Sequence, residues 1–152
     1  MSQKTLPPSA LMAIVGTIDP DAAAVGSYST GWISMSDFQG IQAIILAGAL
    51  GTAATIDAKL EQATDDAGTG VKDVDGAVIT QLTKVGADDN KQSIIEIWGE
   101  DLDISNSFSH ARLTIDVGTA NSDFAAIVIG LHPRQGPASE YDLASVAEIV
   151  TL

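Results

Sequence analysis

The chain has 152 residues, a length that fits one domain with a buried core. It has 20 acidic residues, 7 basic residues and no cysteine. The lack of cysteine excludes disulfide bonds and thiolate metal sites. The excess of acidic residues disfavours binding to nucleic acid or an anionic membrane, because phosphate groups are bound by clustered Lys and Arg. The N-terminus lacks the features of a signal peptide, and the longest apolar runs, residues 41–50 and 124–131, are too short to span a membrane. We therefore expect a soluble protein synthesised in the cytoplasm.

The first third of the chain predicts an arm and then a strand. A Pro-Pro pair disfavours both a helix and a central strand, so residues 1–10 are expected to form an irregular N-terminal arm. Residues 11–18 fit a strand, which the turn signal Asp19-Pro20-Asp21 should end. The small and polar residues 22–31 predict a loop.

The middle of the chain carries the clearest strand pattern. Residues 32–35 and 40–47 are extended segments, and the second is apolar enough to be buried on both faces. In residues 54–62, apolar Ile56, Ala58 and Leu60 alternate with polar residues, which predicts a strand with one buried and one solvated face.

Shorter elements follow. Residues 63–76 are rich in Asp and Gly and predict a loop, residues 77–82 a short strand or one helical turn, and residues 84–91 a turn. Residues 93–98 resume a strand in which Ile95 and Ile97 face away from Ile94 and Glu96.

Two further strands precede the C-terminus. In residues 110–117, Ala111, Leu113, Ile115 and Val117 alternate with polar residues, whereas residues 124–131 are apolar on both faces. A segment containing Pro133 and Pro137 ends the second strand. Residues 141–152 fit either a helix or an extended arm.

Short strands separated by Gly, Asp and Asn turns, without alternating helices, predict an all-β fold. We expect a single antiparallel β-sandwich or barrel, jelly-roll-like, over residues 11–140. Extended arms at residues 1–10 and 141–152 should flank it.

Four aspartates and three glycines resemble a calcium-binding loop in composition. They are Asp65, Asp66, Asp73, Asp75, Gly68, Gly70 and Gly76. A calcium ion takes about six to eight oxygen ligands, of which residues 73–76 supply a fragment. Because the late bidentate glutamate of an EF-hand is missing, a solvated loop is favoured and we predict no metal site.

The histidines do not predict catalysis. His110 and His132 are the only two, and a triad needs a nucleophile, a histidine and an orienting carboxylate. Ser107, Ser109 and Asp103 lie near His110 in the sequence, but no nucleophile-elbow motif is present. Adjacent strand residues alternate faces, so Ser109 and His110 should point apart. We predict no catalytic residue, no cofactor site and no enzyme activity.

The two tryptophans, Trp32 and Trp98, could stack on a sugar. Each lies in an apolar strand, which favours packing in the core or in an interface.

Several stretches of the chain, spread over residues 28–150, resemble a family of small virion proteins encoded among the head genes of tailed bacteriophages. The stretches are residues 54–65, 68–73, 79–82, 89–92, 108–113 and 136–138. The resemblance implies a virion structural protein, and most plausibly a capsid decoration, or cement, protein that binds the outside of the head and stabilises the shell. It carries over no catalytic residues.

A decoration role implies the major capsid protein as partner and the capsid surface as location. The alternatives are a head–tail connector or tail subunit and, less favoured because aromatic residues are few, a receptor or glycan-binding module. Ile44, Ile45, Ile94, Ile127 and Ile129 supply much apolar surface, so we also predict a homo-oligomer, with a trimer favoured.

Overall fold

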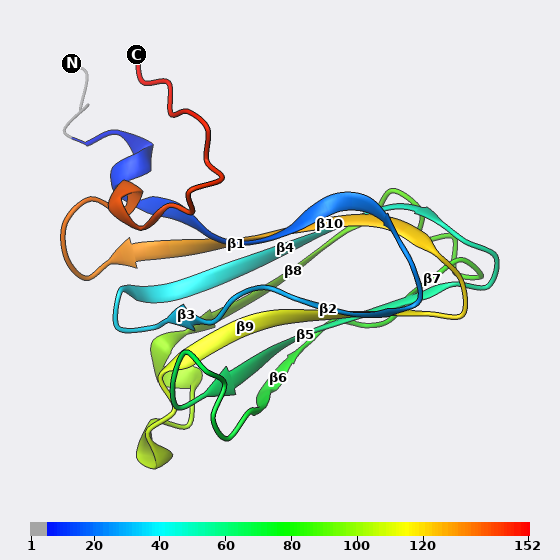
Figure 1. Ribbon diagram of the computed structural model, residues 1–152, viewed down its shortest axis with the longest axis horizontal. Helices are drawn as coiled ribbons and strands as arrows, with labels where there is room; N and C mark the ends of the chain where they lie inside the picture. The colour runs from blue at the N-terminus through cyan, green and yellow to red at the C-terminus, as the bar shows by residue number, and fades with distance from the viewer. Residues whose placement is uncertain (1–5) are drawn as a thin grey trace.

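The computed structural model describes residues 6–152 and shows two antiparallel sheets packed face to face (Figure 1). Sheet A contains, in spatial order, β1 (Met12–Ala23), β10 (Ser122–Pro133), β4 (Phe38–Leu50) and β8 (Gln92–Trp98). Sheet B contains β2 (Gly26–Ser29), β9 (His110–Gly118), β5 (Thr55–Ala63) and β6 (Lys72–Val78). The short strands β3 (Ile33–Ser34) and β7 (Leu82–Thr83) pair with β9 and β5. The first five residues of the predicted N-terminal arm lie outside the described residues.

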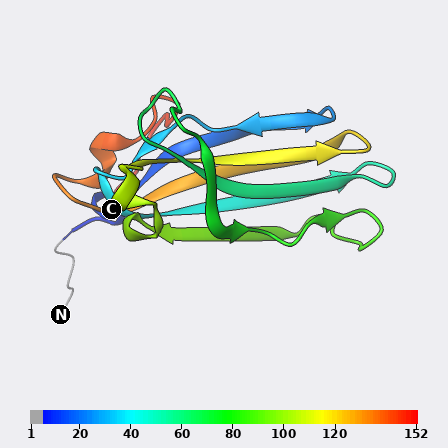
Figure 2. The same ribbon diagram turned by 90° about the horizontal axis from the view of Figure 1, so that it is seen from below.

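The strand order is that of a jelly roll. Among the eight longer strands counted along the chain, sheet A holds the first, eighth, third and sixth, and sheet B the second, seventh, fourth and fifth. Each sheet thus joins strands from both halves of the chain, as in paired Greek keys. Figure 2 shows the long strands running side by side along the molecule. The predicted all-β, antiparallel, jelly-roll-like sandwich is confirmed.

The core lies between the two sheets and follows the predicted alternation. Ile56, Leu60, Leu113 and Ile115 are fully buried from sheet B, where the polar residues between them face outward. Sheet A contributes the opposite layer. Its buried side chains include Ile41, Ala43, Ile45, Ile95, Ile97, Phe124, Ala126 and Val128. Each fully buried aliphatic side chain stabilises the fold by about 1.5–3 kcal/mol, so this interlocking layer holds the sheets together.

Three predicted boundaries were wrong. The turn signal at Asp19-Pro20-Asp21 does not end β1, which runs to Ala23 with a register shift between Ile18 and Asp21. Proline is accepted there because β1 is an edge strand with an irregularity, so no ladder hydrogen bond is lost. The predicted loop at residues 22–31 contains β2, and the loop at residues 63–76 contains the start of β6.

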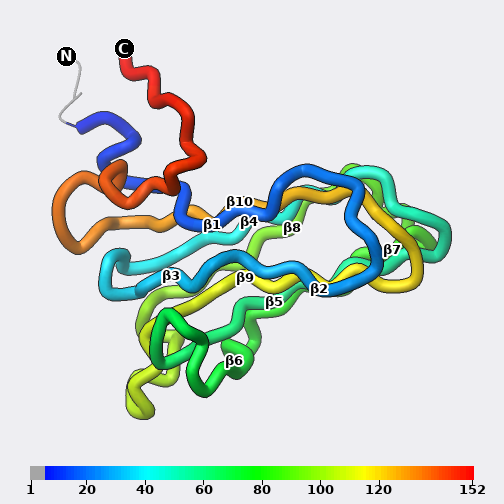
Figure 3. The backbone as a smooth tube through the Cα atoms, in the orientation of Figure 1, coloured from blue at the N-terminus to red at the C-terminus, as the bar shows by residue number. Residues whose placement is uncertain are grey.

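Both ends of the described chain lie near β1. The 3-10 turns η1 (Pro8–Ala10) and η4 (Ala138–Tyr141) contact each other, and Ala10 and Ala138 are buried. The Tyr141 ring meets Phe38 edge to face, with centroids 5.2 Å apart. The Leu143 amide then donates to the Ile14 carbonyl at 2.9 Å. Beyond this point the chain extends away from the sandwich, so the helical alternative for the C-terminal residues was wrong (Figure 3).

Other segments complete the description. The 3-10 turns η2 (Gly99–Asp101) and η3 (Ile104–Asn106) form the connection between β8 and β9. Within residues 6–152, no helix has the length and apolar character required to cross a bilayer.

Candidate docking surface

The outer face of sheet A is apolar across all four strands. On β4, Ile41, Ala43 and Ile45 point into the core with no exposed surface, so the alternate residues point outward. The strand register places the outward residues in rows across the sheet. The rows are Met12, Leu131, Gly40 and Trp98; Ile14, Ile129, Gln42 and Glu96; Thr17, Ile127, Ile44 and Ile94; and Ala125, Leu46 and Gln92. We call this set the apolar face.

The apolar face is open to solvent in the isolated chain. The most exposed apolar side chains are Ile94 at 58%, Trp98 at 51%, Met12 at 44% and Leu46 at 42%. Glu96 is the one charged residue of the set, and its carboxylate accepts a hydrogen bond from Gln42 Nε2 at 3.0 Å. Strand spacing and rise give the face an area of roughly 400 Å². Patches of this size on soluble proteins commonly mark interaction surfaces.

The prediction that residues 40–47 are buried on both faces was therefore wrong for the single chain. Ile45 lies in the core, whereas Ile44 lies on the apolar face. The same holds for β10, where Val128 is buried and Ile127 and Ile129 face outward. A strand that is apolar on both faces belongs to a sheet covered on both sides. In this chain, sheet B covers the inner side of sheet A, and the outer side of sheet A is the apolar face.

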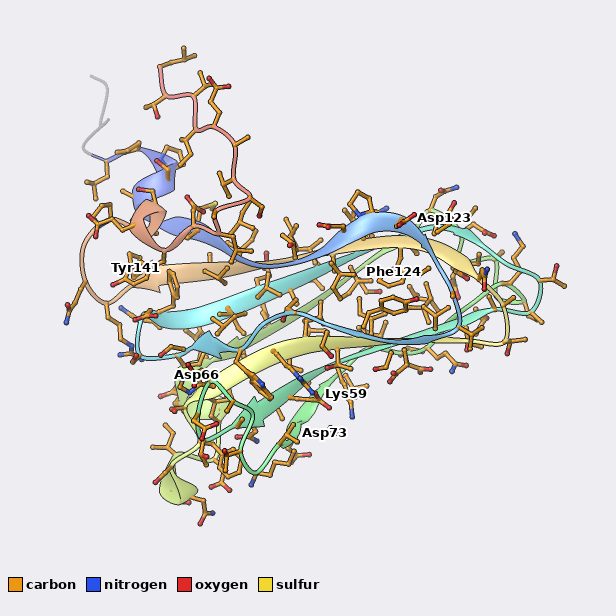
Figure 4. The ribbon with its side chains drawn as sticks, in the orientation of Figure 1. Lys59, Asp66, Asp73, Asp123, Phe124 and Tyr141 are labelled. Carbon is orange, nitrogen blue, oxygen red and sulfur yellow. The ribbon has the colours of Figure 1, made fainter. Side chains whose placement is uncertain are left out.

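Hollows mark the two ends of the apolar face. At one end Gly40 leaves room for the Trp98 indole, because a Cβ there would lie 3.0 Å from Trp98 Cε3. Trp98 stacks on His132 with ring centroids 6.3 Å apart, beside a hollow of about 90 Å³. At the other end, where β1 bows outward (Figure 1), a hollow of about 560 Å³ lies beside Leu46. Asp123 and Phe124, labelled in Figure 4, belong to its lining. These hollows could receive side chains of a partner.

Sheet B presents an outer face of opposite chemistry. The Glu61 carboxylate accepts hydrogen bonds from Arg112 Nε and Thr114 Oγ1, each at 2.8 Å. Lys59 Nζ lies 2.7 Å from Asp73 Oδ1 and 3.5 Å from Glu61 Oε1. Burial acts to raise the pKa of Glu61, but the hydrogen bonds from Arg112 and Thr114 lower it below its ordinary value. Paired charges of this kind suit a solvated surface, in contrast to the apolar face.

The basic side chains of the described residues all have partners. Besides Lys59 and Arg112, the ion pairs are Lys72 with Asp103, Lys84 with Asp89, and Lys91 with Asp88. Arg134 Nε donates to the carbonyls of Met35 and Phe38. Exposed acidic residues line the β1 end of the apolar face: Asp19, Asp21 and Asp123. This end of the apolar face is therefore acidic.

The aspartates of the calcium-like loop are not brought together. Asp65 Oδ1 accepts the amides of Ala67 at 3.1 Å and Thr69 at 2.9 Å, which closes its own turn. Hydrogen bonds from the side chain and then the backbone of Thr69 lower the pKa of Asp65. Asp73 pairs with Lys59 on β5, and Figure 4 shows it apart from Asp66. Among residues 6–152, no group of three or more His, Cys, Asp or Glu side chains is arranged to hold a metal ion.

The predicted separation of Ser109 and His110 was wrong. Ser109 Oγ lies 2.9 Å from His110 Nδ1. Strand alternation does not apply because β9 begins at His110. Ser109 Oγ also donates to the Thr64 carbonyl at 3.2 Å, which is a structural role. Within the described residues, no carboxylate hydrogen-bonds to the His110 ring, so the orienting member of a triad is missing there.

Neither tryptophan belongs to the buried core, so the core part of that prediction was wrong. Trp98 lies on the apolar face. The Trp32 ring lies 4.5 Å from the Arg112 guanidinium carbon, and the backbone of Gly68 packs against its indole. Trp32 thus braces the loop after β5 against the polar side of the sandwich.

No family model matches the sequence, and no curated protein sequence does. Among solved structures, the chain is similar to a chain of infectious bursal disease virus, Gt strain, with a TM-score of 0.48, 10% identity and coverage of 84% of this chain and 33% of that one. It is similar to a chain of broad bean stain virus, with a TM-score of 0.41 and 8% identity; the match covers 90% of this chain and 97% of that one. It is also similar to a xylan-binding domain of Paenibacillus barcinonensis Xyn10C, with a TM-score of 0.40 and 14% identity; the match covers 84% of this chain and 95% of that one.

The chain spans about a third of the length of the bursal disease virus chain. A jelly-roll architecture hosts many unrelated functions. Function has to be argued from the surfaces of this chain.

Proposed function

We propose that this chain is a virion structural protein of a tailed bacteriophage, and specifically a decoration protein that binds the outside of the head and stabilises the shell. The observation that carries this proposal is the apolar face on sheet A, opposite the ion-paired face of sheet B. An uncovered apolar sheet face favours a docked neighbour. The sequence resemblance to phage head proteins supplies the identity of that neighbour.

The proposed partner is the major capsid protein. The apolar face holds a single charge, and its β1 end is lined by Asp19, Asp21 and Asp123. A complementary shell surface would be apolar at its centre, with basic residues where it meets these three aspartates. Binding to such a surface should weaken as salt concentration rises, because salt screens exposed charges.

The proposed role requires neither catalysis nor a bound cofactor. We propose that the protein is not an enzyme, carries no cofactor and resides on the capsid surface as a homo-oligomer, with a trimer favoured. A head–tail connector or tail subunit is the alternative role for the same surface.

Binding to shells that lack the protein tests the proposal. Leu46→Lys places a charge on the apolar face, and Val85→Lys makes a matched change at an exposed position in the turn after β7. We expect Leu46→Lys to lose co-sedimentation with shells and Val85→Lys to retain it. Equal binding by both variants would refute docking through the apolar face. Binding to isolated tails rather than shells would favour the alternative role.

A further inference from the structure

Strand β8 leaves one edge of sheet A open. Among residues 6–152 its single ladder partner is β4, and the Trp98 amide donates to Asp101 Oδ2 at 2.7 Å. This amide therefore points away from β4. In an antiparallel strand, alternate residues direct their backbone groups to the same side. Ile94 and Glu96 thus present their N–H and C=O groups at the free edge.

A groove runs beside this edge. A hollow of about 600 Å³ lies between β8 and β6. Its lining combines apolar Val78, Ile79, Ile94 and Ile97 with the carboxylates of Asp75, Glu96 and Asp101. The register between β8 and β4 has no bulge, and β8 contains neither Pro nor Lys. Natural sheets usually protect an open edge with such features, so β8 is suited to accept another strand.

The C-terminal residues supply an apolar segment that makes no hydrogen bond within the described chain. We call residues 147–152 the terminal segment. The Val146 amide donates to the Leu143 carbonyl, and no hydrogen bond between described residues involves the chain beyond it. The segment has no regular secondary structure, and Ile149, Val150 and Leu152 are exposed. Figures 1 and 3 show this end of the chain projecting away from the sandwich.

We propose that the terminal segment of one copy adds as a strand to the free edge of β8 in a second copy. The segment leaves the sandwich beside β1, whereas β8 forms the opposite edge of sheet A. Donor and acceptor therefore lie on different sides of each molecule, and the contact is head to tail. Repetition of such a contact gives a ring when the rotation closes. This contact rests on the proposed homo-oligomer and names the strand that joins its copies; it needs no shell and leaves the apolar face free.

Complementary variants test the contact in the isolated protein. A chain ending at Val146 lacks the donor strand but keeps the acceptor edge. Glu96→Pro removes an N–H at the free edge while sparing the ladder to β4, and Glu96→Gln is its matched control. In sedimentation velocity, we expect wild type and Glu96→Gln to associate and each of the other two variants to be monomeric. A mixture of those two should form only a 1:1 dimer, since each supplies the part that the other lacks.

Cross-linking provides a second readout should Glu96→Pro fail to fold. The chain has no cysteine, so Glu96→Cys combined with Val150→Cys introduces the only thiols. Oxidation should yield closed or ladder-like species larger than dimers, whereas either single variant can yield dimers at most. A monomeric wild type, association unchanged by loss of the terminal segment, or a double variant limited to dimers would each overturn the proposal. Because Leu46→Lys should still associate, failure here is distinguishable from failure of shell docking.

Discussion

Adjacent isoleucines on β8 separate docking from folding. Ile94 lies on the apolar face with 58% of its surface exposed, whereas Ile95 lies in the core with 7% exposed. Fully burying such a side chain is worth about 1.5–3 kcal/mol. Covering the exposed part of Ile94 on docking would therefore add about 1–2 kcal/mol. We expect Ile94→Ala to weaken shell binding by about 5- to 30-fold and to leave the melting temperature almost unchanged.

Ile95→Ala should show the reverse behaviour. Truncation in the core removes buried contacts and leaves a cavity, at about 2–5 kcal/mol, which lowers the melting temperature by about 5–20 °C for a chain of this length. Shell binding at a temperature where the variant is folded should stay near wild type. Calorimetry and shell co-sedimentation on both variants measure the two quantities. Equal loss of binding in the two variants, or unchanged binding in Ile94→Ala, would refute the assignment of the outer face to docking.

Four further outcomes are expected. Gly130→Ala should lower stability by about 1–3 kcal/mol in urea unfolding, because the new Cβ would lie 2.7 Å from the Phe38 ring; Gly31→Ala, with open space around it, should not. The pKa of Glu61 is lowered in the folded state, so its stabilisation is present above the ordinary glutamate pKa of about 4.3 and is lost as pH falls; Glu61→Gln should flatten the acid side of the stability profile. Deleting residues 147–152 should leave the melting temperature unchanged, whereas deleting residues 1–10 should lower it without unfolding the protein, since Ala10 is buried. A chelator should leave the melting temperature unchanged, and a rise with calcium concentration would contradict the absence of a metal site.

Local alternation was sufficient to predict the buried faces of several strands. Ile56 and Leu60 on β5 and Leu113 on β9 lie in the core as predicted, because a period of two fixes the side of the sheet that each residue occupies. The failures had other physical causes. Pro20 signals a turn locally, but at a bulged edge strand it interrupts no ladder bond.

The candidate surface was only partly predictable. The pattern of residues 40–47 and 124–131 indicated cover on both faces but could not say whether the chain or a partner supplies it. The sequence assigns five isoleucines to an association surface: Ile44, Ile45, Ile94, Ile127 and Ile129. The structure places four of them on the apolar face, but Ile45 lies in the core, so the prediction was wrong for that residue. The open edge of β8 depends on pairing between strands distant in sequence, which local patterns do not encode.

The most direct test of the docking claim is a cryo-EM reconstruction of the phage particle at a resolution that separates the two sheets. The proposal predicts density for this chain on the outside of the head, with the apolar face of sheet A against the capsid protein and the Glu61–Arg112 side of sheet B toward solvent. Sheet B against the shell, or density confined to the tail or connector, would contradict it.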